Sequence, residues 1–278
     1  MNTLDYAPMS TSEFARVQRL VRRYTGIEIT AQKREMLHAR LAKRVRALGL
    51  GGFGPYIRAL EDGHEVELRE FISAITTNLT HFFREPHHFE MLEQEILPTI
   101  LERADRASPI RIWSAGCSTG MEPYSIAMVA REQVPQLEHR RIQIHACDID
   151  QRVLEIARRG VYSQDSIADV APERLRRWFR KGVGANSGWV RVTDDLRASV
   201  RYFEMNLSHE WSVHRPFDVI FCRNVLIYFE PRMQVRIVDR FADALPIGGT
   251  LFLGHSESLY RKTTRFECLS RTAFRRIA

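Results

Sequence analysis

Residues 110–125 read IRIWSAGCSTGMEPYS, an apolar β-forming run followed by a glycine-rich turn and a helix that opens near Pro123. Glycines in such a turn let the backbone approach a ligand closely. In open α/β sheets, ligands bind where strands end at their carboxyl side. The stretch therefore predicts the first strand of a parallel α/β sheet, with a binding site at the turn Gly116–Gly120.

The segments that follow alternate between strand-like and helical patterns. Strands are predicted at IQIHACD from Ile142, at FDVIFC from Phe217 and at TLFLGH from Thr250. Helices are predicted from about Glu122, Gln151 and Pro231. This alternation is typical of a mostly parallel sheet covered by helices. The rhythm breaks in residues 161–200, where a short helix, the loop KGVGANSG and the strand WVRV predict a small antiparallel β-subdomain insertion.

The chain before the sheet has a helical pattern. Ser10 and Glu13 form a capping-box pattern, and Gly26 is placed to end the first helix. A second apolar stripe and two short helices follow, so residues 1–86 are predicted to be an all-helical domain. Residues 87–107 are predicted as a linker helix, and residues 108–278 as the domain that contains the sheet and the insertion.

Composition limits the possible classes of protein. With 44% hydrophobic and 27% charged residues among 278, the chain is globular. The absence of long apolar runs and of a signal-peptide core predicts a cytoplasmic protein. The four scattered cysteines and the histidines lack metal-site spacing, so we expect no metal and reduced, buried thiols. Of the net charge of +7, six units lie in residues 1–50.

Asp148 ends the second strand, about thirty residues after the turn. An acid at this place can accept hydrogen bonds from ribose hydroxyls, so turn and acid together indicate an adenosine-containing ligand. Two alternatives remain. Gly116, Ser118 and Gly120 also match the nucleophile elbow of α/β-hydrolases, with Asp218 and His255 following in the required order. The turn could also join strand and helix without binding a ligand.

The segment TNLTHFFRE, residues 77–85, lies between the helical region and the sheet. It could serve as a helix cap and an apolar plug between domains. Alternatively it folds over the nucleotide pocket, with Asn78 and Thr80 bonding the ligand and Arg84 binding a carboxylate.

Five stretches together resemble the CheR family of chemotaxis receptor methyltransferases. They are TNLTHFFRE, WSAGCSTGMEPYS, DID, FDVIFCRNVLIYF and GGTLFLGHSES. The resemblance covers nearly the whole chain. It implies a Rossmann-like class I methyltransferase fold, with a mostly parallel sheet, an all-helical N-terminal domain and a small antiparallel insertion. It also implies a protein-glutamate O-methyltransferase that uses S-adenosylmethionine and yields S-adenosylhomocysteine.

The resemblance also implies which residues form the site. The cofactor contacts would be Asn78, Thr80, Arg84, Gly116, Glu122, Asp148, Asn206, Leu207, Arg223 and Asn224. Arg84 and Tyr228 would be the catalytic residues, neither of them an acid or a base. The family usually reads GEEPYS where this chain reads GMEPYS. Met121 therefore replaces the first glutamate, and Glu122 is left to make the contact.

The implied partner is the cytoplasmic domain of methyl-accepting chemotaxis receptors, with the enzyme recruited to membrane receptor clusters as a monomer. The insertion would bind a receptor C-terminal peptide by adding it as a strand. Basic residues near one helix would approach the receptor: Lys33, Arg34, Arg40, Lys43, Arg44 and Arg46. We expect no nucleic-acid partner. The alternatives are a nucleic-acid acceptor bound through this basic region, and a binding module that has lost activity, as Met121 would suggest.

Overall fold

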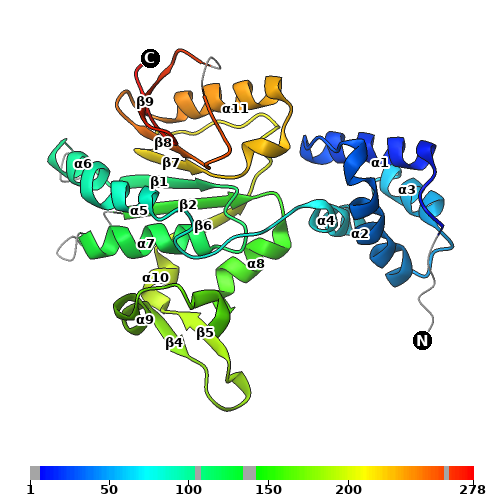
Figure 1. Ribbon diagram of the computed structural model, residues 1–278, viewed down its shortest axis with the longest axis horizontal. Coiled ribbons are helices and arrows are strands. Elements are labelled where there is room, and N and C mark those ends of the chain that lie inside the picture. Colours follow the sequence, from blue (N-terminus) through cyan, green and yellow to red (C-terminus); the bar gives the residue numbers. More distant parts are fainter. Residues whose placement is uncertain (1–6, 104–107, 134–141, 260–262) are drawn as a thin grey trace.

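The computed structural model describes residues 7–103, 108–133, 142–259 and 263–278. Its centre is a seven-stranded sheet of order β6-β2-β1-β7-β8-β10-β9 (Figure 1). The first five strands in this order are parallel to one another. The strand β10 pairs antiparallel with β8 on one side and with β9 on the other. The strands are β1 (Ile110–Ala115), β2 (Ile142–Asp148), β6 (Val200–Glu204), β7 (Val219–Cys222), β8 (Thr250–Leu253), β9 (Phe266–Ser270) and β10 (Ala273–Arg276). The predicted fold class is confirmed.

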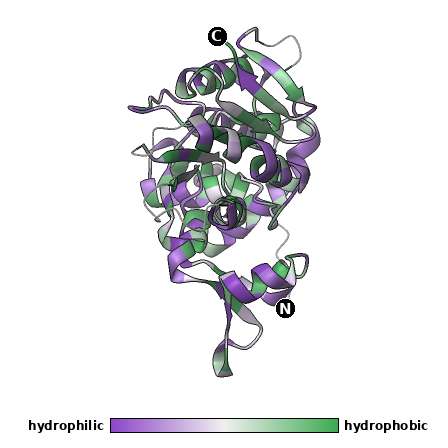
Figure 2. Ribbon diagram, turned by 90° about the vertical axis from the view of Figure 1, so that its left-hand side faces the viewer, coloured by the Kyte–Doolittle hydropathy of each residue, from purple (hydrophilic) through white to green (hydrophobic). Residues whose placement is uncertain are grey.

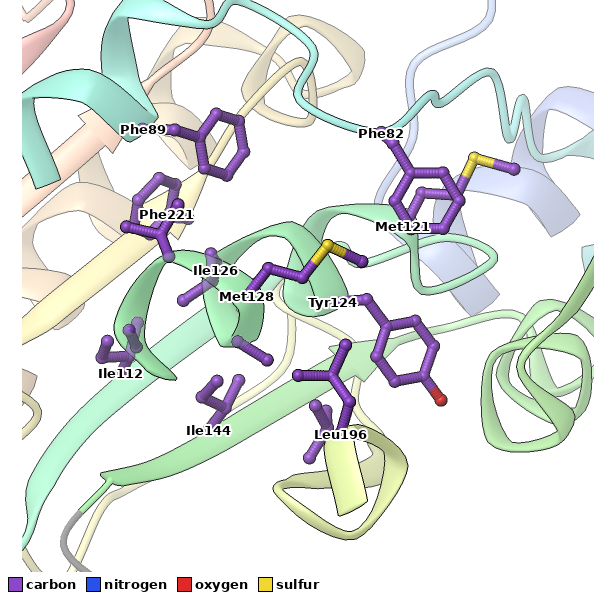
Figure 3. Packing of buried hydrophobic residues seen from close by; sticks show 14 of the residues in the cluster. Phe82, Phe89, Ile112, Met121, Tyr124, Ile126, Met128, Ile144, Leu196 and Phe221 are labelled. Atoms are coloured by element: carbon purple, nitrogen blue, oxygen red, sulfur yellow. The ribbon is translucent and has the colours of Figure 1, made fainter. Parts of the chain in front are cut away.

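Helices cover both faces of the sheet. Neighbouring side chains of a strand point to opposite sides, so the apolar side chains on each face need a covering layer of their own. Ile112 of β1 packs in the core beneath α7 (Met121–Gln133), which Figure 3 shows from close by. Its neighbour Trp113 packs on the other face, against residues of α11 (Pro231–Ala244). Both side chains are fully buried. The apolar character of the whole strand thus follows from its central place between two helical layers.

The N-terminal lobe has a core of its own. It consists of α1 (Thr11–Thr25), the 3₁₀ turn η1 (Ala31–Lys33), α2 (Arg34–Ala47), α3 (Phe53–Glu61) and α4 (Glu65–Ile75). The capping box of Ser10 and Glu13 begins α1, and Gly26, with a φ of 72°, ends it. Figure 1 shows this lobe beside the carboxyl edge of the sheet. No helix among the described residues is long and apolar enough to cross a membrane.

The segment from Thr76 to Pro86 crosses from α4 to the sheet domain. It is called the linker below and is distinct from the linker helix expected at residues 87–107. Phe82 is buried edge-to-face against Tyr162 and Phe179, and the Phe83 amide donates to Ser125 Oγ at 3.0 Å. A helical run follows: α5 (His87–Met91), the π-helical turn η2 (Leu92–Ile96) and α6 (Leu97–Arg103). The expected linker helix therefore contains a π turn, and residues 104–107 lie outside the described residues.

The insertion follows α8 (Gln151–Arg159) and forms a second sheet of order β3-β5-β4, with antiparallel strands. Its elements are β3 (Val161–Ser163), η4 (Gln164–Ile167), α9 (Pro172–Trp178), β4 (Phe179–Lys181), η5 (Gly184–Asn186), β5 (Trp189–Val192) and α10 (Asp194–Ala198). The β4–β5 hairpin projects from the molecule (Figure 1), and Figure 2 colours its tip as hydrophobic. Val183 at this tip is 82% exposed.

One expectation about the cysteines is wrong. All four are free, and Cys117, Cys147 and Cys222 are buried as expected, but Cys268 is exposed. Cys268 lies on β9, which is the outermost strand and therefore has a neighbour on one side alone.

Candidate active site

A pocket of about 370 Å³ lies where β1, β2 and β7 end, and the helical lobe closes its other side. All eleven residues proposed for the site line it. They are Asn78, Thr80, Arg84, Gly116, Glu122, Asp148, Asn206, Leu207, Arg223, Asn224 and Tyr228. The helical lobe adds Thr25, Ile27, Ile29, Lys33, Met36 and Ile75. The volume is in the range typical of small-molecule sites.

The glycine turn is held close to neighbouring backbone. The amides of Gly116 and Cys117 both donate to Cys147 O, at 2.8 and 2.9 Å. Gly116 has a φ of 81°, and a Cβ there would lie 2.4 Å from Val225 Cγ2. The turn therefore requires glycine both for its backbone conformation and for its fit against the loop after β7.

Asp148 is 8% exposed at the end of β2 and faces the same turn. Its Oδ2 accepts the Ser118 amide at 2.8 Å, and its Oδ1 accepts the Asp150 amide at 3.0 Å. Burial raises the pKa of Asp148 to about 6, although the backbone amides oppose this shift. Each oxygen can accept a further hydrogen bond, so the carboxylate can receive two hydroxyl groups from a ligand.

Asp150 is a site residue that the sequence reasoning missed. It is 1% exposed, and its Oδ2 accepts the Asn78 side-chain amide at 2.9 Å and the Thr76 hydroxyl at 3.1 Å. Ser118 Oγ in turn donates to Asn78 O at 3.0 Å. The Asn78 amide group thus fastens the linker over the pocket. The signal that could have identified Asp150 is its place as the second acid of the DID stretch, two residues after the end of a buried strand.

Arg223 is the centre of a buried charge network, with its side chain 1% exposed. Its Nη1 lies 3.1 Å from Glu122 Oε2 and its Nη2 lies 3.3 Å from Glu85 Oε2, and it also donates to Arg84 O. Ser114 donates to the other oxygen of Glu122 at 2.7 Å. Arg223 therefore fixes Glu122 and the linker in place.

Glu85 was not predicted, and it connects this network to the strand β8 side of the sheet. Its Oε1 lies 2.8 Å from His255 Nδ1, and His88 Nδ1 lies 3.5 Å from its Oε2. Burial alone would raise the pKa of Glu85, but the His255 hydrogen bond and the Arg223 charge lower it to about 2. Glu85, His87 and His88 each bring a possible metal ligand within 4.8 Å of the others. The nearby Arg223 cation disfavours a metal ion there.

Tyr228 and Asn224 lie in the loop after β7. Tyr228 ends the 3₁₀ turn η6 (Leu226–Tyr228), and the Lys33 ammonium lies 5.7 Å from the centre of its ring. Tyr228 O accepts the Glu28 amide at 3.0 Å, which joins the loop to the helical lobe. Arg84 donates to Leu79 O at 3.0 Å and so shapes the linker turn.

Asn206 also joins the two lobes. Its Nδ2 donates to Tyr24 O at 2.9 Å, and its Oδ1 accepts the Ser208 amide at 2.9 Å. Both ends of the side chain are thus used in an Asx-type turn and in the contact with α1. Leu207, 5% exposed, lines the pocket beside it.

The hydrolase alternative does not fit this arrangement. Asp218 immediately precedes β7, and its Oδ2 accepts the Arg111 amide at 2.8 Å near the start of β1. Ser118 lies at the opposite, carboxyl ends of these parallel strands. Asp218 therefore cannot orient a histidine for Ser118 as a triad requires.

Two of the basic residues expected to face a partner are structural instead. Arg40 donates to Ile75 O and Thr76 O, both at 2.9 Å, and so caps the end of α4. Arg44 pairs with Glu67 at 2.7 Å and with Glu70 at 2.9 Å. Reversing their charges would disrupt the lobe. Of the six basic residues considered, Lys33, Lys43 and Arg46 are exposed.

Met121 belongs to the apolar core that also contains Phe82 (Figure 3), and it is 9% exposed. Restoring the usual glutamate by Met121→Glu places a charge in this core. We expect a loss of about 1 to 3 kcal/mol in the free energy of unfolding and no gain in cofactor affinity. Chemical denaturation and calorimetry measure the two quantities, and tighter cofactor binding by the variant would contradict this expectation.

Comparison with known proteins yields two family matches. "CheR methyltransferase, SAM binding domain" matches residues 78–275, and "CheR methyltransferase, all-alpha domain" matches residues 12–76. The chain is 41% identical over 270 residues to the chemotaxis protein methyltransferase of Klebsiella aerogenes, covering 96% of this chain and 90% of that protein. For the Escherichia coli K12 protein of the same description the values are 40% over 269 residues, 96% and 91%. For chemotaxis protein methyltransferase 2 of Pseudomonas aeruginosa they are 38% over 263 residues, 94% and 92%.

Proposed function

The chain belongs to the CheR methyltransferase family, and on this premise we propose that it methylates glutamate side chains of bacterial chemoreceptors in chemotaxis adaptation. The methyl donor is S-adenosylmethionine and the product of methylation is a glutamyl methyl ester. The observation that carries the proposal is the pocket itself. Its lining brings together the glycine turn, the buried Asp148 and Glu122 near the start of α7.

The residues present suit this cofactor. The carboxylate of Asp148 has free acceptor capacity for the ribose hydroxyls, and Gly116 leaves room for close approach of a ligand to the backbone. Glu122 presents a negative charge suited to the ammonium of the methionine part. Asn78, Thr80, Arg84, Asn206, Leu207, Arg223 and Asn224 complete the proposed binding set. For Asn206 and Arg223, whose side-chain hydrogen bonds are made within the protein, we propose an indirect contribution through the pocket's shape.

The bound cofactor supplies an electrophilic methyl group on a sulfonium. The acceptor glutamate, with an ordinary pKa near 4.3, is ionised at neutral pH, so no residue need remove a proton. The protein's task is to orient the acceptor and exclude water that would solvate its carboxylate. We assign orientation of the acceptor glutamate to Tyr228, which has Lys33 beside its ring. We assign to Arg84 the positioning of the cofactor's methyl group towards this acceptor.

The rim of the pocket suits a protein acceptor. Leu79 and Ile227 line the pocket yet are 76% and 47% exposed. Exposed apolar side chains beside a site are typical of surfaces that a partner covers. A receptor segment that presents its glutamate here would bury them. Within this proposal residues 1–86 act as the acceptor-facing domain, 87–107 as the linker helix, and 108–278 as the catalytic domain of a monomer.

The test uses labelled S-adenosylmethionine with membranes that contain chemoreceptors. We expect transfer of label to the receptor and release of methanol by mild base, which distinguishes a carboxyl methyl ester from N-methylation. Glutamine in place of the receptor's acceptor glutamates should abolish transfer. Cofactor binding without transfer would indicate a binding module, and transfer to RNA would indicate a different acceptor.

We also propose that the insertion tethers the enzyme to receptor clusters by binding a receptor C-terminal peptide. The outer strands of its sheet, β3 and β4, have unpaired edges that can accept another strand. Trp189 is 50% exposed beside the loop 181–188, and the basic residues Arg180, Lys181 and Arg191 are exposed. This surface suits an acidic peptide with an aromatic residue, and tethering would raise the local enzyme concentration.

Deletion of residues 184–186 tests the tether. The amide of Gly182 donates to Trp189 O at 2.8 Å across this loop, so the deletion should distort the end of the hairpin. We expect binding to an immobilised receptor tail to be lost, while affinity for S-adenosylmethionine stays unchanged, because none of the described loop residues lines the pocket. A receptor without its tail is the control. Retained tail binding by the deletion variant would refute the tether.

A further inference from the structure

Glu257, just after β8 in the GHSES stretch, is 6% exposed, and its carboxylate is held by backbone amides of the described residues. Its carboxylate accepts five N–H groups from two loops. The donors are the amides of Asn224 (2.9 Å), Val225 (2.8 Å), Leu226 (2.7 Å), Ile227 (3.3 Å) and Gly254 (2.6 Å). No described side chain among its hydrogen-bond partners carries the opposite charge.

Successive amides that converge in this way form an anion-binding concavity. Here the anion is the chain's own carboxylate. Hydrogen bonds to an ionised acceptor are roughly twice as strong as those between neutral groups. The loop that follows β7 is thus organised around Glu257, because its four successive amides from Asn224 to Ile227 donate to this carboxylate.

The loop held by Glu257 carries two of the residues that line the pocket. Asn224 has a φ of 60°, in the left-handed region that an asparagine adopts when its surroundings enforce it. Tyr228 ends the 3₁₀ turn one residue after the last amide bound to Glu257. A change in the anchor would therefore move both side chains at once.

Gly254 packs the same loop from the other side. A Cβ at Gly254 would lie 2.4 Å from Asn224 Nδ2 and 2.8 Å from Asn224 N. The Glu257 carboxylate on one side and the close contact with Gly254 on the other together restrict where Asn224 can lie.

We propose that Glu257 is a positioning residue for methyl transfer, which holds Asn224 and Tyr228 at the place where the acceptor carboxylate meets the methyl group. This rests on the proposed function. The groups assigned to the cofactor's adenosine and methionine parts, Asp148 and Glu122, belong to β2 and α7 rather than to this loop. Loss of the anchor should therefore affect turnover much more than cofactor binding.

The first variant is Glu257→Gln, which removes the charge and puts an NH₂ group in place of one carboxylate oxygen, against two or three of the five N–H donors. We expect kcat for receptor methylation to fall about 10- to 100-fold, as small misplacements in active sites do. The dissociation constant for S-adenosylmethionine should rise much less, because Asn224 of the proposed binding set lies in this loop but Asp148 and Glu122 do not. Glu267→Gln is the matched control. Glu267 lies on β9 and pairs with Arg275 at the surface, and this variant should keep full activity.

A second variant keeps the test decisive if the first fails to fold. Gly254→Ala leaves Glu257 intact but displaces Asn224, and it should show the same loss of kcat with a much smaller loss of cofactor affinity. Native kcat in a folded Glu257→Gln variant, or a cofactor affinity that falls in proportion to kcat in either variant, would overturn the positioning role. Failure of the unaltered protein to methylate receptors would overturn the proposed function instead.

Discussion

Replacing Arg223 by leucine is expected to lower the free energy of unfolding by about 3 to 5 kcal/mol, because it leaves two carboxylates buried without their cation. Glu122 and Glu85 have side chains 12% and 11% exposed, and both lose their ion pair with Arg223. The linker also loses the hydrogen bond to Arg84 O. Such a loss corresponds to a fall in melting temperature of roughly 6 to 20 °C, which calorimetry measures.

The pH dependence of this loss identifies its cause. In the unaltered protein the pKa of Glu85 lies near 2, so its ion pair stabilises the fold above the ordinary glutamate pKa and is lost as the pH falls towards 2. The variant keeps the His255 hydrogen bonds to Glu85 but loses the part of this contribution that comes from Arg223, so its buried carboxyls take up protons at a higher pH. The difference in stability between the two proteins should therefore shrink as the pH falls through the range in which these carboxyls take up protons, towards 2.

Arg16→Leu is the matched control. Arg16 pairs with Glu61 at the surface, with side chains 28% and 40% exposed, and such solvent-screened pairs contribute little to stability. If Arg223→Leu costs no more than Arg16→Leu, or if its cost is independent of pH, the buried network does not stabilise the fold as described.

The central sheet could be predicted because its strands are buried on both faces. The apolar runs that begin at Ile110, Ile142 and Thr250 coincide with the starts of β1, β2 and β8. The pattern does not predict β6, β9 or β10. In β9, FECLS, partly buried and exposed residues mix because the strand lies at the edge of the sheet, so the pairing with β10 rather than burial defines it.

The site could be predicted from its motifs, but the direction of each side chain could not. Asn78 and Arg223 line the pocket, yet their hydrogen bonds are to Asp150, Glu122 and the linker. Glu257 lies within the GGTLFLGHSES stretch, but its role as an anchor could not be predicted, because its partners are backbone amides that any sequence carries. Arg40 was expected on a basic surface, but it caps the C-terminal end of α4, which lies more than thirty residues further along the chain.

Asp148→Ala is expected to weaken S-adenosylmethionine binding about 10- to 100-fold, because a hydrogen bond to a charged group contributes about 1.5 to 3 kcal/mol. The change also leaves the amides of Ser118 and Asp150 without their acceptor. Isothermal calorimetry measures the affinity, and the thermal transition of the cofactor-free variant shows whether the turn itself has collapsed. Unchanged affinity would exclude Asp148 from the ribose site.

The pKa of Asp148 adds a test in the unaltered protein. Because burial raises this pKa to about 6, a proton competes with the ribose hydroxyls below that pH. The affinity should be constant between about pH 6.5 and 7 and fall up to about tenfold per pH unit below 6, a range in which the cofactor's carboxyl and amino groups keep their charges. The side chain at residue 148 cannot ionise in Asp148→Asn. This variant should therefore bind S-adenosylmethionine more weakly, and the part of the pH dependence that comes from Asp148 should be absent. Burial also raises the pKa of Glu122, which lines the same pocket, so any slope that persists in Asp148→Asn comes from groups other than Asp148. Identical slopes in the two proteins would show that the Asp148 carboxylate does not contact the cofactor.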